Sequence, residues 1–218
     1  MVPTGTTYLP PNQTGTNQWP ATGSPYPAGT PTSGTLAGNS SAILSTFHTS
    51  TAATYTSPAG NGSQYSFSSN NWLPADYYQV VLPTTGYTSL SVSWDQARSS
   101  TGPAAFKLQM STNGTSFTDL TPTPYTVLQS GGGGAPGTWS TATYNALYSS
   151  TFALPVSADN QASLYVRFTN SESAASAATG SNRIDNISIT SVPEPSTVAL
   201  AAVGLGFSRL LVRRRRSS

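Results

Sequence analysis

Several short segments of this chain alternate apolar and polar residues with a period of two, as Leu90, Val92 and Trp94 alternate with serines. Successive side chains of a β-strand point to opposite faces of its sheet, so this period predicts strands that bury one face. The same alternation recurs in residues 106–110, 164–168 and 187–189, and residues 42–48 and 77–82 are further strand candidates. The chain is therefore expected to fold mainly from half-buried strands.

Turn-forming residues separate the predicted strands. The pair Asn113-Gly114 lies between two of them and predicts a hairpin over residues 104–120. No convincing helical pattern occurs before residue 191, and strands without crossover helices are typical of an antiparallel β-sandwich. We therefore predict an all-β domain, an antiparallel sandwich, over residues 40–190.

Residues 1–39 are rich in Pro, Gly, Thr and Ser and lack periodicity, so we expect a low-complexity, disordered lead. The lead contains no pattern of a basic region followed by an apolar one, as a signal peptide would. We expect the true start of the chain to lie upstream, or the signal peptide to have been removed.

Residues 191–218 have a third pattern, in which a proline-containing motif, an apolar run and an arginine cluster follow one another. The motif is Val192, Pro193, Glu194 and Pro195, and the cluster is Arg213, Arg214, Arg215 and Arg216. Two prolines disfavour helix and central strand, which leaves Glu194 on an extended segment. Residues 197–212 would span about 24 Å as a helix, against about 30 Å of hydrocarbon. We predict a short, weak transmembrane helix with the arginines on the cytoplasmic side.

This order of elements resembles the PEP-CTERM sorting signal. The resemblance implies an exported bacterial protein that the inner membrane holds transiently and that an exosortase cleaves near Pro193-Glu194-Pro195. An ordinary single-pass anchor is the alternative for the tail. Residues 86–117 and 183–189 resemble jelly-roll passenger domains, galactose-binding-like or concanavalin-like, that often accompany this signal.

Charge is concentrated in the tail. Five of the nine basic residues are Arg209 and the arginine cluster, so the rest of the chain is slightly acidic and shows no footprint for nucleic acid. The chain has no cysteine, and its core must form without disulfides. Lys107 is the only lysine, so edge strands have little protection against pairing, and we expect self-association of the sandwich.

Asp185 is the one candidate metal ligand. By strand parity it shares the inward face of Ile187 and Ile189, and a buried carboxylate must be hydrogen-bonded or bind a cation. Calcium, which takes carboxylate and carbonyl oxygens, is the functional interpretation. The alternative is a carboxylate that accepts backbone N–H bonds or pairs with Arg183 or Arg167.

Aromatic residues give a second set of candidates. Trp94-Asp95 could form a sugar platform, because aromatic faces stack on sugar rings, but Trp94 has the parity of core residues. The aromatic residues near predicted loops are better candidates for exposure; these are Trp72, Tyr77, Tyr78 and Trp139.

Catalytic machinery is poorly supported. Six acidic residues precede the tail without a recognisable pair for glycoside hydrolysis. His48 is the only histidine, so the chain lacks the residues that a histidine-based metal site or catalytic relay needs. We therefore predict a non-enzymatic structural or adhesive protein of the cell surface or exopolysaccharide matrix. The alternative is a carbohydrate-binding module of the cell envelope, which would require an exposed aromatic patch.

Overall fold

The computed structural model of the chain describes residues 6–8 and 43–193, except residues 57 and 64. The predicted tail helix, Glu194, Pro195 and the arginine cluster lie outside these residues, as does most of the predicted lead. Residues 6–8 of that lead form strand β1 (Thr6–Tyr8), which pairs with β12. Threonine and tyrosine favour strands, and a strand with a vacant side accepts such a segment.

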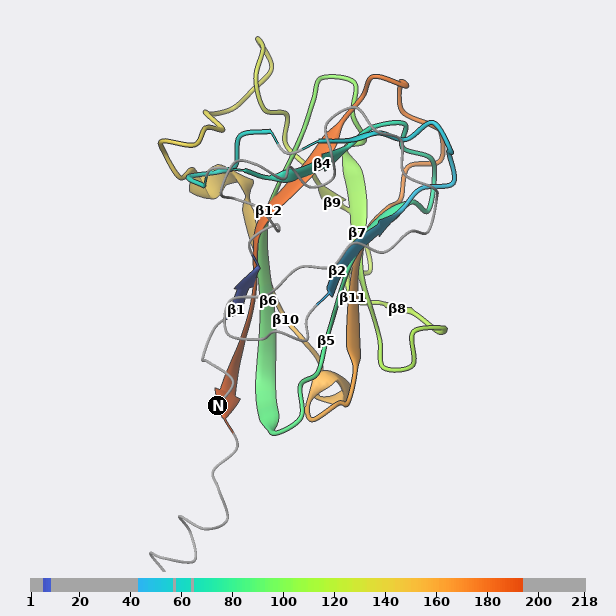
Figure 1. The fold of residues 1–218 in the computed structure, drawn as a ribbon, viewed down its shortest axis with the longest axis vertical. Helices are drawn as coiled ribbons and strands as arrows, with labels where there is room; N and C mark the ends of the chain where they lie inside the picture. Colours follow the sequence, from blue (N-terminus) through green and yellow to red (C-terminus); the bar gives the residue numbers. More distant parts are fainter. Residues whose placement is uncertain (1–5, 9–42, 57, 64, 194–218) are drawn as a thin grey trace, which may run out of the picture.

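The first sheet has the strand order β10-β6-β12-β4-β3, and β1 also pairs with β12. Its strands are β3 (Tyr55–Thr56), β4 (Phe67–Ser69), β6 (Tyr87–Arg98), β10 (Ser149–Ala153) and β12 (Asn182–Pro193). The two long strands, β6 and β12, run side by side along the molecule (Figure 1).

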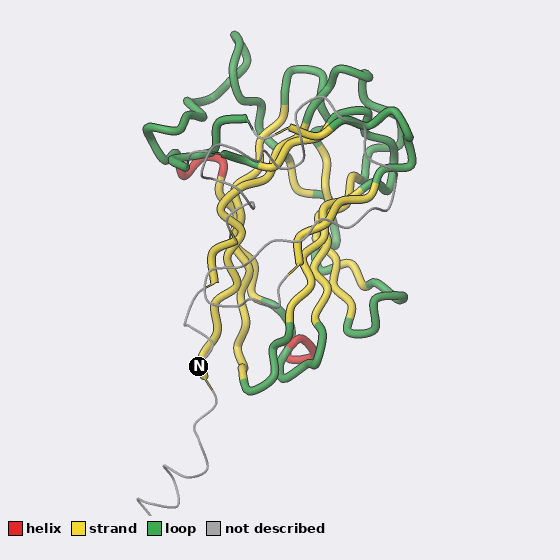
Figure 2. The backbone as a smooth tube through the Cα atoms, in the orientation of Figure 1, coloured by secondary structure: helices red, strands yellow, loops and turns green. Residues whose placement is uncertain are grey.

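The second sheet has the order β2-β5-β11-β7-β8, and β9 also pairs with β7. Its strands are β2 (Ile43–Phe47), β5 (Tyr77–Leu82), β7 (Ala105–Ser111), β8 (Thr118–Asp119), β9 (Tyr125–Thr126) and β11 (Leu164–Asn170). Neighbouring strands pair antiparallel in both sheets. Figure 2 shows the sheets as two layers, with most loops gathered at one end. The predicted antiparallel β-sandwich is confirmed.

The core lies between the sheets. Trp94 of β6 meets Phe168 of β11 with ring centroids 5.0 Å apart, and Val92 and Val166 are buried beside them. The parity prediction for Trp94 is therefore confirmed. Each such fully buried side chain contributes on the order of 1.5–3 kcal/mol.

The predicted exposure of two aromatic residues is wrong. Trp72 and Tyr78 are both 0% exposed. Trp72 Nε1 donates to the Ser69 carbonyl (2.9 Å), and the Tyr78 hydroxyl donates to the Asn182 carbonyl (2.7 Å). Because their polar groups have partners inside the protein, both rings can be buried without an unsatisfied donor.

A bulge in β12 reverses the orientation predicted for Asp185. The register shifts between Asp185 and Ser188, and Asn186 has a φ of 47°. Ile184 and Ile187 both enter the core although they are three residues apart. Asp185 pairs directly with Asp95, the neighbour of inward Trp94, so it lies on the outer face. One extra residue in a bulge reverses strand parity, which the alternation alone did not show.

The predicted hairpin over residues 104–120 is confirmed, because β7 pairs with β8. Its loop is longer than a tight turn. Asn113 Oδ1 accepts from the backbone N–H groups of Thr115 and Ser116, and Gly114 takes a φ of 73°. The left-handed backbone there explains the glycine.

The helical elements within residues 43–193 are the 3₁₀ turns η1 (Ala146–Tyr148) and η2 (Val156–Ala158). Among the described residues, no helix has the length and apolar character needed to cross a membrane. β12 continues to Pro193, whose backbone pairs with that of Tyr87. Two residues of the proline motif thus belong to the sheet, three residues beyond the predicted end of the sandwich. A proline is tolerated there because it ends the strand.

Candidate functional site

Four planar side chains stack on the outer face of the second sheet, and we call them the aromatic stack: Phe47, Tyr77, Arg167 and Phe117. The rings of Phe47 and Tyr77 are 5.3 Å apart and nearly parallel. The guanidinium carbon of Arg167 lies 3.9 Å from the Tyr77 ring centroid and 3.4 Å from that of Phe117. All four side chains are half-buried. Burial lowers the pKa of Arg167, and Tyr77 acts in the opposite direction.

Strand register explains this arrangement. Tyr77 of β5 pairs with Phe47 of β2, so both rings lie on one face at the same level. Arg167 of β11 lies one level along the same face, between Gln79 and Gln109. Phe117 comes from the loop between β7 and β8. The outward-facing residues of three alternating strands thus lie together on one surface, which the sequence of a single strand does not show.

A row of polar side chains runs beside the aromatic stack. Arg167 Nε donates to Gln79 Oε1 (2.7 Å), and the Thr169 hydroxyl donates to Gln109 Oε1 (2.7 Å). Gln109 Nε2 donates to Asp119 Oδ1 (2.7 Å). Lys107 pairs with the same carboxylate at 2.6 Å. The hydrogen bond from Lys107 is the main cause that lowers the pKa of Asp119.

A pocket of about 330 Å³ lies beside the loop that carries Phe117. Ser116 and Thr118, the neighbours of Phe117, line it together with Asn113, Met110 and Pro155. Tyr165 packs edge-on against Phe117, with ring centroids 6.4 Å apart. Hydroxyls, an amide and aliphatic side chains therefore line the pocket, and the rings of Phe117 and Tyr165 lie beside it.

The other aromatic candidates lie elsewhere. Trp139 is half-buried in the loops over the outer face of the first sheet, where its Nε1 donates to the Ala59 carbonyl (2.7 Å). Its ring packs edge-on against Tyr148 at 5.2 Å. Of the four residues predicted to be exposed, only Tyr77 belongs to the aromatic stack. Phe47, Phe117 and Arg167 were missed, although the alternation in residues 164–168 places Arg167 on the outer face.

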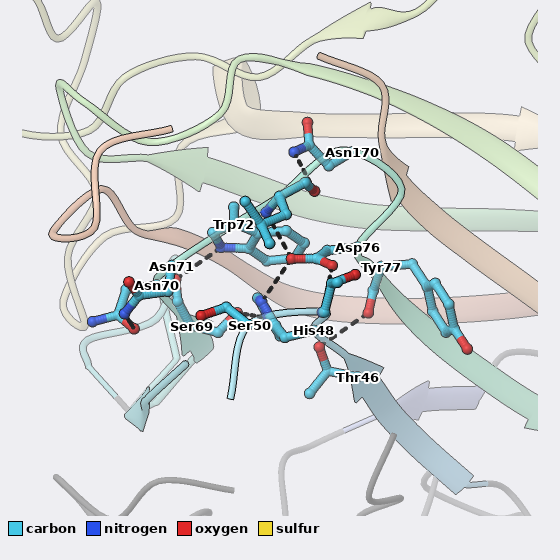
Figure 3. A network of polar contacts seen from close by, with 12 residues as sticks. Thr46, His48, Ser50, Ser69, Asn70, Asn71, Trp72, Asp76, Tyr77 and Asn170 are labelled. Carbon is cyan, nitrogen blue, oxygen red and sulfur yellow. Dashed lines mark hydrogen bonds and ion pairs between the residues drawn. The ribbon is translucent and has the colours of Figure 1, made fainter. Parts of the chain in front are cut away.

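His48 belongs to a buried polar network that the sequence did not reveal (Figure 3). Its Nδ1 lies 3.1 Å from Asp76 Oδ2, in contact but off the direction of a hydrogen bond. Its Nε2 lies 3.0 Å from the Ser69 hydroxyl, which in turn lies 3.2 Å from the Tyr78 hydroxyl. The Trp72 ring packs edge-on against the imidazole at 4.4 Å.

This order of aspartate, histidine and serine matches that of a nucleophilic relay. Both side chains of the His48–Asp76 pair are 0% exposed, and Ser69 is also buried. A substrate has no access to a serine in this position. Asp76 instead accepts from the backbone N–H groups of Thr49 (2.8 Å) and Leu73 (2.7 Å). The network therefore fixes the chain after β2 and before β5.

We expect Asp76→Ala to lower the free energy of unfolding by about 3–5 kcal/mol, because it removes one partner of a buried pair. It also orphans two backbone N–H groups. Urea denaturation of the sandwich measures the change. Asp119→Ala is the control, since it removes an exposed ion pair and should cost at most about 1 kcal/mol. Equal losses in the two variants would contradict a stabilising role for the network.

Asp95 and Asp185 form a second buried network, on the outer face of the first sheet. Asp185 Oδ2 accepts from Asn61 N (2.8 Å) and from the Ser63 hydroxyl (2.6 Å). Asp95 Oδ2 accepts from Asn61 Nδ2 (2.9 Å) and from Asn186 Nδ2 (2.7 Å). Together the two carboxylates hold the loop around Asn61 against the sheet.

Calcium would require oxygen ligands around these carboxylates. The groups that face Asp185 Oδ2 and Asp95 are N–H and O–H donors, including the Ser149 hydroxyl. Of the carboxylate oxygens of Asp95 and Asp185, Asp185 Oδ1 is the one that is buried without a hydrogen-bond partner in the structure. In the described part of the chain, no three His, Cys, Asp or Glu residues lie together as metal ligands, and no arginine pairs with Asp185. The donors fit a hydrogen-bonded carboxylate, and calcium binding by Asp185 stays a prediction.

The pKa of Asp185 is raised from 3.8 to about 6, chiefly by burial and in smaller part by nearby Asp95, against the lowering effect of the hydrogen bonds from Ser63 and Asn61. Between about pH 4 and pH 6 the folded state therefore binds more protons than the unfolded state. The free energy of unfolding should fall as pH rises through this window, by up to roughly 3 kcal/mol.

Asp185→Asn should flatten this dependence, because an amide does not titrate. Chemical denaturation at several pH values between 4 and 7 measures the slope, and Asp119→Asn is the exposed control that should keep it. An unchanged slope in Asp185→Asn would show that another group causes the pH dependence.

Comparison with known proteins gives one family match. Residues 191–216 match the PEP-CTERM protein-sorting motif. No curated protein matches the chain.

Several solved structures resemble the sandwich. The CBM22-1 xylan-binding domain of Xyn10C from Paenibacillus barcinonensis is 10% identical, with 70% of this chain and 87% of that chain covered and a TM-score of 0.41. The K1 cleaved adhesin domain of Lys-gingipain from Porphyromonas gingivalis is 13% identical, with 70% and 99% covered and a TM-score of 0.40. TmCBM61 in complex with β-1,4-galactotriose is 8% identical, with 70% and 90% covered and a TM-score of 0.40. At these values the likeness carries no information about ligands, and the strand pairing itself shows the sandwich.

The motif match covers the predicted cleavage motif, from Val192 to Pro195, and the arginine cluster from Arg213 to Arg216. The chain therefore carries, at residues 191–216, the PEP-CTERM sorting motif, which indicates an exported, exosortase-sorted surface protein.

Proposed function

We propose that the sandwich is a non-enzymatic adhesive domain that binds polysaccharide at the cell surface or in its matrix. The observation that carries this proposal is the aromatic stack with its polar row on the outer face of the second sheet. An exposed aromatic patch is the feature that distinguishes a sugar-binding domain from a purely structural one.

The chemistry of the surface suits a sugar chain. Phe47 and Arg167 cover the two faces of the Tyr77 ring, so the apolar C–H groups of a sugar would pack against the outward edges of the stacked rings. The sugar hydroxyls would exchange hydrogen bonds with the neighbouring amides and carboxylates. Gln79, Gln109 and Asp119 supply both donors and acceptors along the polar row. Several weak contacts along a flat surface favour an extended polymer over a small molecule.

The stack is also rigid before any ligand arrives. Arg167 lies between two rings and donates to Gln79, so the side chains that would meet a sugar already have fixed positions. Fixed side chains lose little conformational entropy on binding. Low charge elsewhere on the surface, with 7% charged residues in the chain, leaves contacts of this kind as the main source of affinity.

Catalysis finds no support in the two buried networks or in the polar row. Asp76, Asp95 and Asp185 are buried and hydrogen-bonded, and His48 is enclosed. Asp119 is exposed but is paired with Lys107. A glycoside hydrolase needs two carboxyl groups that reach one glycosidic bond, and these side chains do not supply them.

Alanine at Tyr77 and at Tyr165, combined in one variant, should weaken polysaccharide binding at least tenfold, which corresponds to about 1.4 kcal/mol. The variant loses ring area and leaves the Arg167 guanidinium without one of its rings. Affinity electrophoresis of residues 1–193, which include β1 and all of β12, in gels containing xylan, galactan or the native matrix polysaccharide measures the effect.

Tyr144→Ala is the matched control, because Tyr144 is 56% exposed beside the first sheet. If Tyr144→Ala weakens binding as much as the combined Tyr77 and Tyr165 variant does, or if neither variant weakens it, the proposed binding surface is contradicted. Sedimentation of the same proteins, in low and high salt, tests the predicted self-association separately.

We also propose that an exosortase cleaves the tail near Glu194 after transient insertion in the inner membrane. The family match supports recognition of the motif. Strand β12 ends at Pro193, which directly precedes Glu194 in the sequence.

Glu194→Ala should leave the tail uncleaved and the protein in the inner membrane, whereas Ser196→Ala should be processed normally. Intact-mass analysis of membrane and secreted fractions checks both variants. Secreted wild-type protein that still contains Arg213 to Arg216 would refute cleavage.

A further inference from the structure

Arg183 differs from every other cation in the described part of the chain. Arg98 donates to three backbone carbonyl groups, Lys107 donates to a carboxylate, and Arg167 donates to an amide oxygen. Arg183 forms no ion pair, and its Nε is buried without a hydrogen-bond partner. Its positive charge is therefore unmatched within the described residues.

The surroundings of Arg183 fix its position. It lies near the start of β12, where its backbone pairs with Ser68 of β4 and Ala97 of β6. Its guanidinium carbon is 5.9 Å from the Trp139 ring, a distance at which a cation is attracted to an aromatic face. Burial lowers the pKa of Arg183, with Tyr78 and Tyr148 acting in the opposite direction.

The side chain lines a pocket of about 170 Å³ at the β3–β4 edge of the first sheet. Hydroxyl-bearing residues make up most of the wall, and they include Thr54, Thr56, Ser68, Thr179 and Ser181. None of the described residues that line the pocket carries a carboxylate. The space is sufficient for several water molecules, and therefore for one small oxyanion.

We propose that this pocket binds an oxyanion, the carboxylate group of an acidic saccharide, with Arg183 as the cation that recognises it. A guanidinium presents N–H donors in a fork that matches two oxygens of such a group. Hydroxyls around it can donate to the remaining oxygens. An unpaired, desolvated cation is costly, and an anionic ligand removes that cost.

The assignment to a saccharide rests on the proposed function, whereas the anion site itself does not. The pocket lies at the edge of the first sheet, and the aromatic stack lies on the second. A neutral polymer on the stack and an acidic group at Arg183 would thus be separate binding events.

Thermal unfolding of the full chain at constant ionic strength tests the site, with sodium glucuronate, sodium sulfate, glucose and sodium chloride as additives. Glucuronate should raise the melting temperature in a saturable way, and glucose and chloride should not. Arg183→Gln should abolish the glucuronate shift or move its midpoint at least tenfold. Lys107→Gln, which removes an exposed cation, should behave as the wild type does.

The variants also separate binding from a structural role. Without added anion, Arg183→Gln should melt at or above the wild-type temperature, because it removes a partly buried charge that forms no ion pair with the described residues. A large loss of stability would make Arg183 a structural residue and overturn the proposal. Arg183→Lys, which keeps the charge but loses the fork, should bind glucuronate more weakly than the wild type.

Each remaining outcome is decisive. Stabilisation by sulfate without glucuronate would overturn the assignment to a saccharide and indicate a site for free inorganic anions. An equal response of wild type and Arg183→Gln would overturn the site. The combined Tyr77 and Tyr165 variant should keep its glucuronate response, so failure of the proposed polysaccharide surface is measured independently.

Discussion

The antiparallel pairing of β6 with β12 is the constraint on which the rest of the structure depends. These strands form the centre of the first sheet, and β12 also carries β1 and β4 on its other side. The bulge after Asp185 lets one strand turn Ile184 and Ile187 into the core while Asp185 faces the outer loops. A straight strand would place either the isoleucines or the carboxylate on the wrong face.

Buried carboxylates take over the role that disulfides have in many exported domains. The chain has no cysteine, and its long irregular connections must be held by other contacts. Asp76 binds the backbone on either side of β4, at Thr49 and Leu73. Asp185 and Asp95 hold the loop at Asn61 against the first sheet. Each carboxylate accepts several hydrogen bonds at once, which makes its burial tolerable.

A feature of this fold could be predicted from the sequence where a local pattern encodes it, and not where it depends on contacts between distant residues. Period-two alternation revealed the strands that contain Trp94 and Phe168, because sheet geometry repeats every two residues. Trp72 and Tyr78 were misplaced because their burial depends on partners at Ser69 and Asn182, which no local pattern encodes. The bulge at Asn186 was invisible for a related reason, since asparagine tolerates a positive φ without requiring one.

The candidate sites show the same difference between what a local pattern encodes and what depends on long-range contacts. Arg167 and Tyr77 lie on predicted strands, but only the pairing of β5 with β11 brings the strands together. Phe117 reaches the stack from a loop whose course depends on Asn113, and the environment of His48 comes from three separate segments. Composition and periodicity therefore identify which residues face outward, whereas the combination that forms a surface requires the register.

The geometry of β12 also relates binding to sorting. Arg183 lies near the beginning of the strand and Pro193 at its end. At a rise of about 3.3 Å per residue, ten residues separate the two by roughly 30 Å, somewhat less where the bulge shortens the path. The motif therefore leaves the sheet at the end opposite the Arg183 pocket. A membrane-bound enzyme that engages Glu194 would approach one end of the sandwich while the pocket remains open at the other, so an acidic polymer bound there would not have to dissociate before the tail is processed.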